Sequence, residues 1–209
     1  MACYHDLPWV EHACQHCAEP TPKNSTNTCP HCLKKAPIIQ KMVCATWFRF
    51  PVKQIIYQFK FNQSLSNAYL LSSLLTATIQ EKYKEDTLPN IIIPAPLSKN
   101  SLKKRGYNQS AMIGKQVSAL LNIPMDAHLI RKVRETRAQH QLNQKERMFN
   151  LKNAFTIEPH TWTHVALIDD VITTNSTMLT LAKLLKKSGV KRIDAWSFAK
   201  TPKKKTFIP

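Results

Sequence analysis

The sequence predicts an α/β fold, in which a mostly parallel sheet carries helices on both faces and a small cysteine-bearing module precedes it. From about residue 45 onward, short apolar runs alternate with amphipathic segments, as is typical of parallel sheets. Four of the six cysteines form two C-x-x-C pairs within the first forty residues. The 209 residues, 43% of them hydrophobic, suffice for one core and a small appended unit. We expect a zinc-finger module over 1–44 and an α/β domain over 45–209.

The cysteine pairs predict a metal site in the N-terminal module. This region is rich in Pro and Asn and lacks helical or strand periodicity, so a cross-link other than a core must hold it together. Two C-x-x-C turns can place four thiolates on a tetrahedral Zn²⁺. His16 and His31 lie inside the turns as alternative ligands, and a closed four-ligand site indicates structural zinc or a docking surface. The four predicted ligands, with eleven residues between the pairs, are Cys14, Cys17, Cys29 and Cys32.

The elements of the α/β domain follow from hydrophobic patterning and from helix signals. The alternating stretch TWFRF predicts a strand from about Ala45, and Pro51 suits the first turn of a helix through about Phe61. A polar segment over Arg131 to Asn153 is expected to be part helix and part mobile loop. The other expected elements are a helix over Ser66 to Tyr83, a strand over Asn90 to Ala95, a basic loop, a helix over Tyr107 to Leu121, a strand over His164 to Asp169, a helix over Ser176 to Lys187 with Met178, Leu181, Ala182 and Leu185 on one face and Gly189 as its stop, and a strand over Val190 to Phe198.

The charge is strongly basic and unevenly spread. Lys and Arg number 30 against 13 Asp and Glu, a formal net charge of +17. Between Leu97 and Ile157 there are 12 basic and three acidic residues, and a second basic group runs from Lys183 into the tail. Such an excess attracts polyanions, either nucleic acid or a polyphosphorylated small molecule. The alternative is a lysine-rich surface that only keeps the protein soluble.

Targeting signals are not evident. No run of about 18 apolar residues occurs, and the N-terminus lacks the basic-then-apolar order of a signal peptide. We expect a soluble cytoplasmic protein without membrane insertion, which reaches the inner face of the membrane only through partners.

The segment VALIDDVITTNST, from Val165 to Thr177, predicts a ligand site. An apolar strand ends in Asp169 and Asp170, and adjacent carboxylates are costly to desolvate unless they meet donors or a cation. Ribose hydroxyls and Mg²⁺ would supply these. The following turn and helix N-terminus form a phosphate cradle from Thr173, Thr174, Ser176 and Thr177. The alternative, an ordinary turn with Ser and Thr caps, explains one or two hydroxyls but not the paired acids.

This segment resembles the phosphoribosyl-diphosphate signature of type I phosphoribosyltransferases, an apolar strand followed by two acids and T-T-G-x-T. Further segments are similar to the ComF (GntX-like) family: the four-cysteine start, YQFKF from Tyr57, PAPLSKNSLKKRGYNQS from Pro94, and RKVRETRAQHQLNQKERMFNLKNAF from Arg131. The resemblance implies a type I phosphoribosyltransferase fold with an N-terminal zinc finger. It also implies a late-competence role in natural transformation, in which incoming single-stranded DNA is handled with other competence or recombination proteins.

The resemblance assigns roles to individual residues. Asn175 replaces the signature glycine, but asparagine tolerates a left-handed backbone, so the turn can still form. Ser98 and Ser101 replace the family's usual histidine and arginine. The pyrophosphate contacts are then left to Lys103, Lys104 and Arg105, and Asn108 and Gln109 orient Arg105. Predicted catalytic residues are Asp169, Asp170 and Arg105; predicted contacts to phosphoribosyl diphosphate with Mg²⁺ are Asp169, Asp170, Thr173, Thr174, Asn175, Ser176 and Thr177; predicted nucleic-acid contacts are Lys103, Lys104, Arg105, Arg131, Arg137 and Arg147.

Three functions are compatible with these residues. The leading interpretation is a competence protein that handles single-stranded DNA and keeps a Mg²⁺-dependent phosphoribosyl-diphosphate pocket. The alternative is a metabolic phosphoribosyltransferase, a pentosyl-transferring enzyme that joins a nucleobase or another nucleophile to the sugar. A third is a zinc-dependent nucleic-acid module without a sugar-phosphate ligand. Tyr57, Phe59 and Phe61 either stack on DNA bases or belong to the core, and no role is assigned to Cys3 or Cys44.

Overall fold

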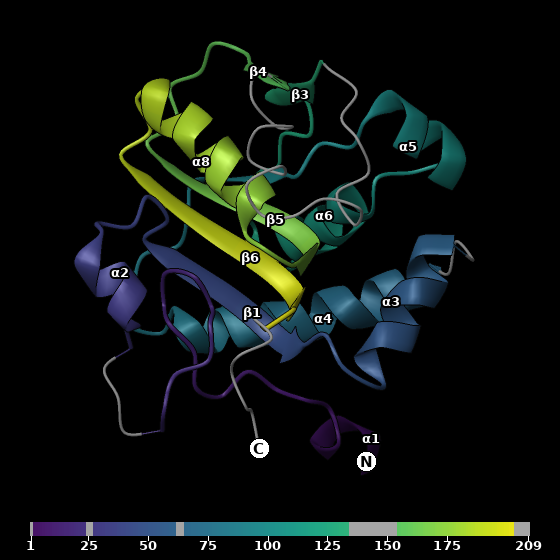
Figure 1. Cartoon of the computed structure of the whole chain (residues 1–209). Helices are drawn as coiled ribbons and strands as arrows, with labels where there is room; N and C mark the ends of the chain where they lie inside the picture. Colours follow the sequence, from purple (N-terminus) through teal and green to yellow (C-terminus); the bar gives the residue numbers. More distant parts are fainter. Residues whose placement is uncertain (1, 24–26, 62–64, 134–153, 203–209) are drawn as a thin grey trace.

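A computed structural model describes residues 2–23, 27–61, 65–133 and 154–202 (Figure 1). Its main sheet has four strands in the order β1-β6-β5-β2, and a separate two-stranded sheet pairs β3 with β4. The elements are α1 (Ala2–His5), α2 (Pro30–Lys34), β1 (Lys41–Trp47), α3 (Val52–Phe61), α4 (Leu65–Lys82), β2 (Ile91–Pro94), α5 (Lys99–Arg105), α6 (Gln109–Leu121), β3 (Ile130–Lys132), β4 (Phe155–Ile157), β5 (His164–Ile172), α8 (Ser176–Lys187) and β6 (Arg192–Lys200).

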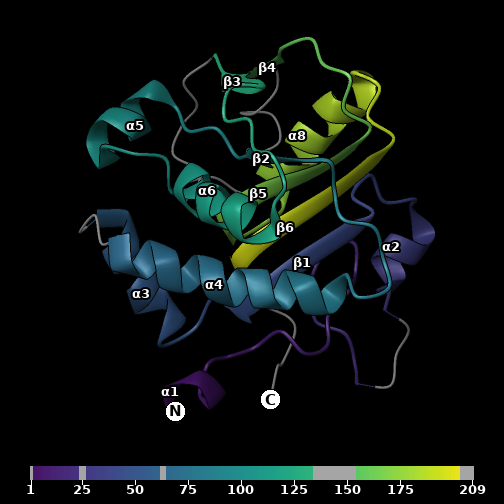
Figure 2. The ribbon, with the colours of Figure 1, turned by 180° about the vertical axis from the view of Figure 1, so that it is seen from behind.

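All three pairings of the main sheet are parallel, and helices cover both faces. Figure 1 shows α8 in front of the sheet, and Figure 2 shows α4 and α6 on the opposite face. Strand side chains alternate between the two layers: Val165 and Leu167 of β5 pack with the α8 side, whereas Ala166 and Ile168 pack with the α4 and α6 side. The predicted parallel α/β sheet with helices on both faces is confirmed.

The first strand differs from its prediction. β1 begins at Lys41 and ends at Trp47, so Phe50, which is exposed, lies outside it. Every residue from 42 to 47 is buried, because the N-terminal segment and α4 cover the two faces of this strand. A strand buried on both faces reads as a continuous apolar run rather than as an alternation. The alternation in TWFRF was therefore misleading, and the expected module boundary after residue 44 falls within β1.

The predicted basic loop after β2 contains a short helix, α5. The Ser98 hydroxyl caps this helix by accepting a hydrogen bond from the Ser101 N–H at 3.2 Å. At the other end, Gly106 adopts a left-handed backbone with φ 81° and closes the last turn. Asn108 then starts α6 by accepting from the N–H groups of its first turn.

The polar segment predicted to begin at Arg131 starts as a strand, because Ile130–Lys132 pairs antiparallel with Phe155–Ile157. The residues between, including the predicted nucleic-acid contacts Arg137 and Arg147, lie outside the described residues. No helix in the described ranges has the length and apolarity needed to span a bilayer.

Candidate ligand and metal sites

The two predicted acids lie near the carboxyl end of β5, a strand flanked by β2 and β6. The strand continues to Ile172, three residues past its predicted end at Asp169, because Val171 and Ile172 still pair with β6. Asp169 is half-buried, and its Oδ1 accepts hydrogen bonds from the Ser110 hydroxyl at 2.7 Å and the Asp170 N–H at 2.9 Å. Asp170 is 6% exposed. Two carboxylates thus share a largely dry position at the end of a strand, where ligands of parallel α/β folds bind.

One lysine balances part of this negative charge. The Nζ of Lys60, from the last turn of α3, lies 2.7 Å from Oδ2 of Asp170. Burial and the neighbouring charge of Asp170 nevertheless raise the pKa of Asp169 to about 7. A second cation, or hydrogen bonds from ligand hydroxyls, would reduce the repulsion between the two carboxylates.

The turn after β5 is the segment for which the sequence predicts a phosphate cradle. Asn175 has a left-handed backbone with φ 62°, so asparagine serves in the conformation for which glycine is the usual residue. The hydroxyls of Thr174 and Ser176 lie 2.9 Å apart, and Ser176 opens α8, a helix of twelve residues. The first turn of such a helix presents N–H groups that have no acceptor within the helix, at the positive end of the helix dipole.

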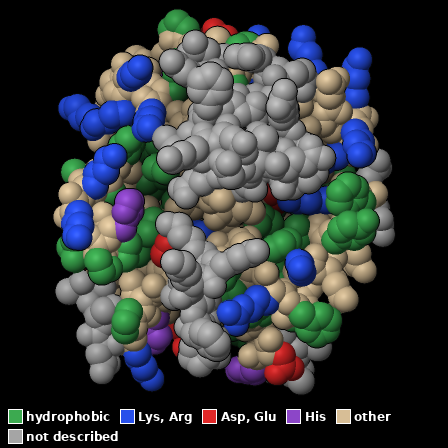
Figure 3. Space-filling view, in the orientation of Figure 1, with side chains coloured by type: hydrophobic (Ala, Val, Ile, Leu, Met, Phe, Trp, Pro, Cys, Tyr) green, Lys and Arg blue, Asp and Glu red, His purple; other side chains and the backbone are tan. Residues whose placement is uncertain are grey.

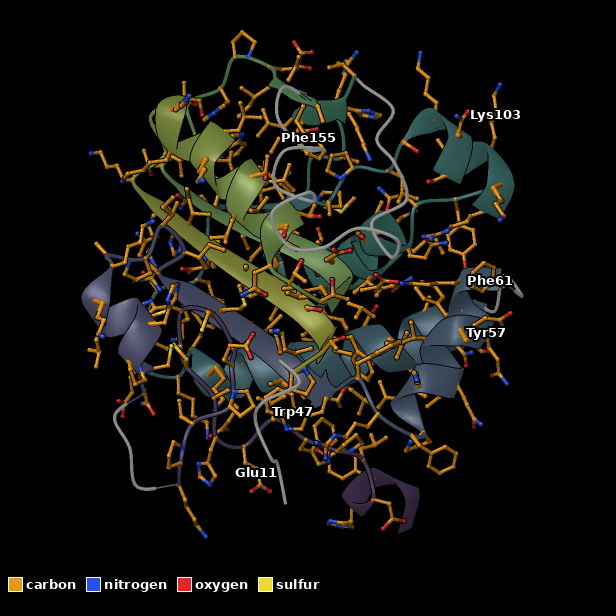
Figure 4. All side chains as sticks on the ribbon, in the orientation of Figure 1. Glu11, Trp47, Tyr57, Phe61, Lys103 and Phe155 are labelled. Carbon is orange, nitrogen blue, oxygen red and sulfur yellow. The ribbon has the colours of Figure 1, made fainter. Side chains whose placement is uncertain are left out.

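The basic residues Lys103, Lys104 and Arg105 form the last turn of α5, shortly before the start of α6. Arg105 Nη1 donates to Gln109 Oε1 at 3.0 Å, so Gln109 orients it as predicted. Asn108 instead donates to the Ala95 carbonyl at 3.0 Å and fixes the start of α6 beside β2. Lys103 projects outward from α5 in Figure 4. In Figure 3, Lys and Arg side chains gather at the upper left and upper right of the same view.

The four predicted metal ligands come together. The Sγ atoms of Cys14, Cys17, Cys29 and Cys32 all lie within 4.8 Å of one another, and those of Cys17 and Cys29 are 3.7 Å apart. A tetrahedral zinc with Zn–S bonds of about 2.3 Å requires sulfur–sulfur distances of about 3.8 Å, so the cluster fits this ion. The hydrogen bond between the Cys14 and Cys17 thiols lowers the pKa of Cys14 and raises that of Cys17, because the two sulfurs share one proton. The four cysteines are placed to bind a metal ion.

Cys44 has a different environment. It is buried in β1, and burial raises the pKa of its thiol to about 12. A thiol of this kind is part of the core rather than a reactive group.

The three aromatic residues of α3 separate into two classes. Phe59 is fully buried, whereas Tyr57 and Phe61 are 63% and 50% exposed, with ring centroids 4.7 Å apart. Figure 4 shows both exposed rings at the side of the molecule that also carries Lys103. Helical spacing explains the division, since residues four apart share a face.

Sequence reasoning missed two residues of the acid site, Lys60 and Ser110. Both lie inside segments that support the family resemblance, YQFKF and PAPLSKNSLKKRGYNQS, and this was the one available signal. Their contacts with the acids span 110 and 59 residues of sequence, so no local spacing indicates them.

Comparisons with known proteins identify clear relatives. No protein-family model matches the chain. It is 35% identical to competence protein F of Haemophilus influenzae over 193 residues, which cover 90% of this chain and 84% of that protein. It is 34% identical to the DNA utilization protein YhgH of Escherichia coli O157:H7, again over 90% of this chain and 84% of the relative. A solved purine phosphoribosyltransferase from Pyrococcus horikoshii is 21% identical and covers 74% of each chain, but its TM-score of 0.35 is too low to support an argument about the site.

Proposed function

Because this chain belongs to the ComF family of competence proteins, we propose that it acts in natural transformation and handles incoming single-stranded DNA, with a pocket that binds phosphoribosyl diphosphate and Mg²⁺. The observation that carries the pocket is the pair Asp169 and Asp170, held at the end of β5 directly before a hydroxyl-rich turn and a helix N-terminus. Carboxylates accept hydrogen bonds from ribose hydroxyls and bind a cation, and the hydroxyls and N–H groups of the turn can donate to phosphate.

Different residues of the pocket would contact different groups of the ligand. Asp169 and Asp170 would accept from the ribose hydroxyls and hold Mg²⁺, while the N–H groups and hydroxyls of 173–177 would hold the 5′-phosphate. Bound Mg²⁺ would supply electrostatic stabilisation of a leaving pyrophosphate. Arg105 offers a bidentate fork to the same diphosphate. Lys60, 2.7 Å from Asp170, balances part of the acids' negative charge before the ligand arrives.

The surface around α3 and α5 carries the kinds of side chain that bind single-stranded DNA. The basic residues Lys103, Lys104 and Arg105 end α5, and the exposed rings of Tyr57 and Phe61 lie on the same side. Non-specific single-strand binders combine a positive groove for the backbone with aromatic faces for the bases. The +17 net charge also exceeds what a small anionic substrate requires.

Calorimetric titration with phosphoribosyl diphosphate and Mg²⁺, combined with an assay for pyrophosphate release, tests the pocket. We expect saturable, Mg²⁺-dependent binding. No binding would remove the pocket from the proposal. Rapid pyrophosphate release with an added nucleobase, and no affinity for single-stranded DNA, would favour the metabolic phosphoribosyltransferase instead.

A further inference from the structure

The turn that forms the candidate phosphate cradle is bonded to the cysteine cluster. The Nδ2 group of Asn175 donates a hydrogen bond to the backbone carbonyl of Cys17 at 2.9 Å, across 158 residues of sequence. Asn175 is the N-cap residue of α8, yet its side chain makes no capping bond to that helix. The side chain is therefore used for the contact with the cysteine turn, while the backbone supplies the left-handed bend.

A second connection runs parallel to the first. Lys200, at the end of β6, is fully buried, and its Nζ donates to the Thr173 carbonyl at 2.9 Å and to Glu19 Oε1 at 3.1 Å. Glu19 belongs to the same cysteine turn, since its carbonyl accepts from the Cys14 N–H at 2.9 Å. Lys200 thus joins the first residue of the cradle to the residue that closes the turn.

The cysteine turn, residues 14–19, is compact and includes one residue in an unfavourable backbone conformation. It is closed by two hydrogen bonds, from Ala18 N–H to the Cys14 carbonyl at 2.8 Å and from Cys14 N–H to the Glu19 carbonyl. Ala18 has a left-handed backbone with φ 52°, which is unfavourable for alanine. A metal held by Cys14 and Cys17 would fix both ends of this strained loop, and with them the positions of the Cys17 carbonyl and the Glu19 carboxylate.

From these contacts we propose that Asn175 and Lys200 are positioning residues that couple metal occupancy at the four cysteines to the shape of the phosphate cradle. The metal-loaded turn holds the cradle in its binding conformation, so ligand affinity depends on the metal. This inference rests on the proposed phosphoribosyl-diphosphate site. It also gives a reason for asparagine at the position where the family signature has glycine, because glycine would allow the same left-handed backbone but could make no side-chain bond to Cys17.

Thermodynamic linkage makes the coupling measurable from the metal side, with protein that starts fully loaded. If metal favours the ligand by some factor, the ligand favours the metal by the same factor. We would follow transfer of zinc from the protein to a zinc-selective chromogenic chelator, with and without saturating phosphoribosyl diphosphate and Mg²⁺. In the wild type the ligand should raise zinc affinity by about fivefold to tenfold.

Asn175→Gly is the informative variant, because glycine accepts the left-handed backbone and keeps the backbone N–H while it removes the side-chain bond to Cys17. Its ligand-dependent protection of zinc should fall to about twofold or less, and without ligand it should release zinc faster than the wild type. Asn122→Gly is the matched control, an exposed asparagine with φ 55° at the end of α6, and it should behave as the wild type. The double variant Asp169→Asn with Asp170→Asn, whose ligand affinity should fall at least about a hundredfold, controls for direct chelation of zinc by phosphoribosyl diphosphate.

The outcomes separate this inference from the proposed function. If calorimetry detects no ligand binding to the wild type, the proposed pocket fails. If the wild type binds the ligand but zinc transfer is unchanged, or if Asn175→Gly keeps the full protection, the pocket stands and the coupling is overturned. Lys200→Met provides a second test, since it removes the parallel connection and should also reduce protection in properly folded protein.

Discussion

Replacement of Asp169 by asparagine should make the unliganded protein more stable and at the same time weaken ligand binding. The introduced amide would keep an Oδ1 that accepts from the Ser110 hydroxyl and from the Asp170 N–H, so the local hydrogen bonds survive. What disappears is a carboxyl whose pKa is raised to about 7 by burial and by the charge of Asp170.

The sign and size of the stability change follow from this pKa. An unfolded aspartate titrates near pH 4. Between about pH 4 and pH 7 the folded protein holds the extra proton, so stability falls as pH rises through this window and the full penalty is present above it. A shift of about three units sets an upper limit of about 4 kcal/mol. Because Asp169 is only half-buried, we discount this limit to about 1–2 kcal/mol.

Thermal denaturation at two pH values checks the stability change. Asp169→Asn should melt about 3–6 °C above the wild type at pH 8 and close to it at pH 4.5. Affinity for phosphoribosyl diphosphate should fall at least about tenfold, the value of one charge-assisted hydrogen bond. Asp6→Asn makes the same chemical change at an exposed position and should alter neither quantity. A lower melting temperature at pH 8, or unchanged ligand affinity, would refute the reasoning.

Three further predictions address other parts of the molecule. Cys29→Ser should lose the metal and expose the N-terminal segment to protease, because a structural zinc contributes on the order of 10 kcal/mol of folding free energy; less than one zinc per chain in native protein would contradict this. Reversal of Lys103 and Lys104 to Glu should flatten the salt dependence of single-stranded DNA binding by roughly 0.7 log units per log unit of salt for each phosphate that α5 no longer neutralises. Fluorescence anisotropy at several salt concentrations measures this, and an unchanged slope would exclude α5 from the DNA surface. Asp86→Asn should destabilise the protein more at pH 7 than at pH 2, because the bidentate bond from Arg192 lowers the pKa of Asp86, and the stability that the carboxylate contributes declines as pH falls below its unfolded pKa of about 4. Urea denaturation at both values checks this, and an equal loss of stability at both would rule it out.

The sequence predicts those elements whose pattern is local. Helix α8 matches its predicted bounds, and Met178, Leu181, Ala182 and Leu185 are all buried as expected, because one face of an isolated amphipathic helix meets the sheet. The cysteine cluster was likewise predicted, since metal-ligand spacing is a short-range pattern. β1 was misplaced because a strand covered on both faces has no alternation to detect.

Contacts between distant segments were beyond local reasoning. Lys60 reaches Asp170 from the end of α3, and Lys200 reaches Thr173 and Glu19 from the end of β6. In the sequence both look like ordinary solvated lysines, because each meets its partner only after segments far apart in the chain have packed together. The role of Asn175 was half predicted: its left-handed backbone follows from residue chemistry, whereas its bond to Cys17 depends on how the N-terminal segment packs.

The electrostatics of the acid pair constrain where DNA can lie. Asp169 and Asp170 repel phosphate unless a cation intervenes, and the one nearby ammonium group that pairs with them in the described residues, Lys60, is already used by Asp170. A single strand bound without Mg²⁺ should therefore avoid the pocket and follow the basic residues of α5. With Mg²⁺, the diphosphate of the ligand can enter the pocket that DNA avoids. The two ligands should then bind together rather than compete, and a single-stranded oligonucleotide that displaced phosphoribosyl diphosphate at saturating Mg²⁺ would contradict this separation.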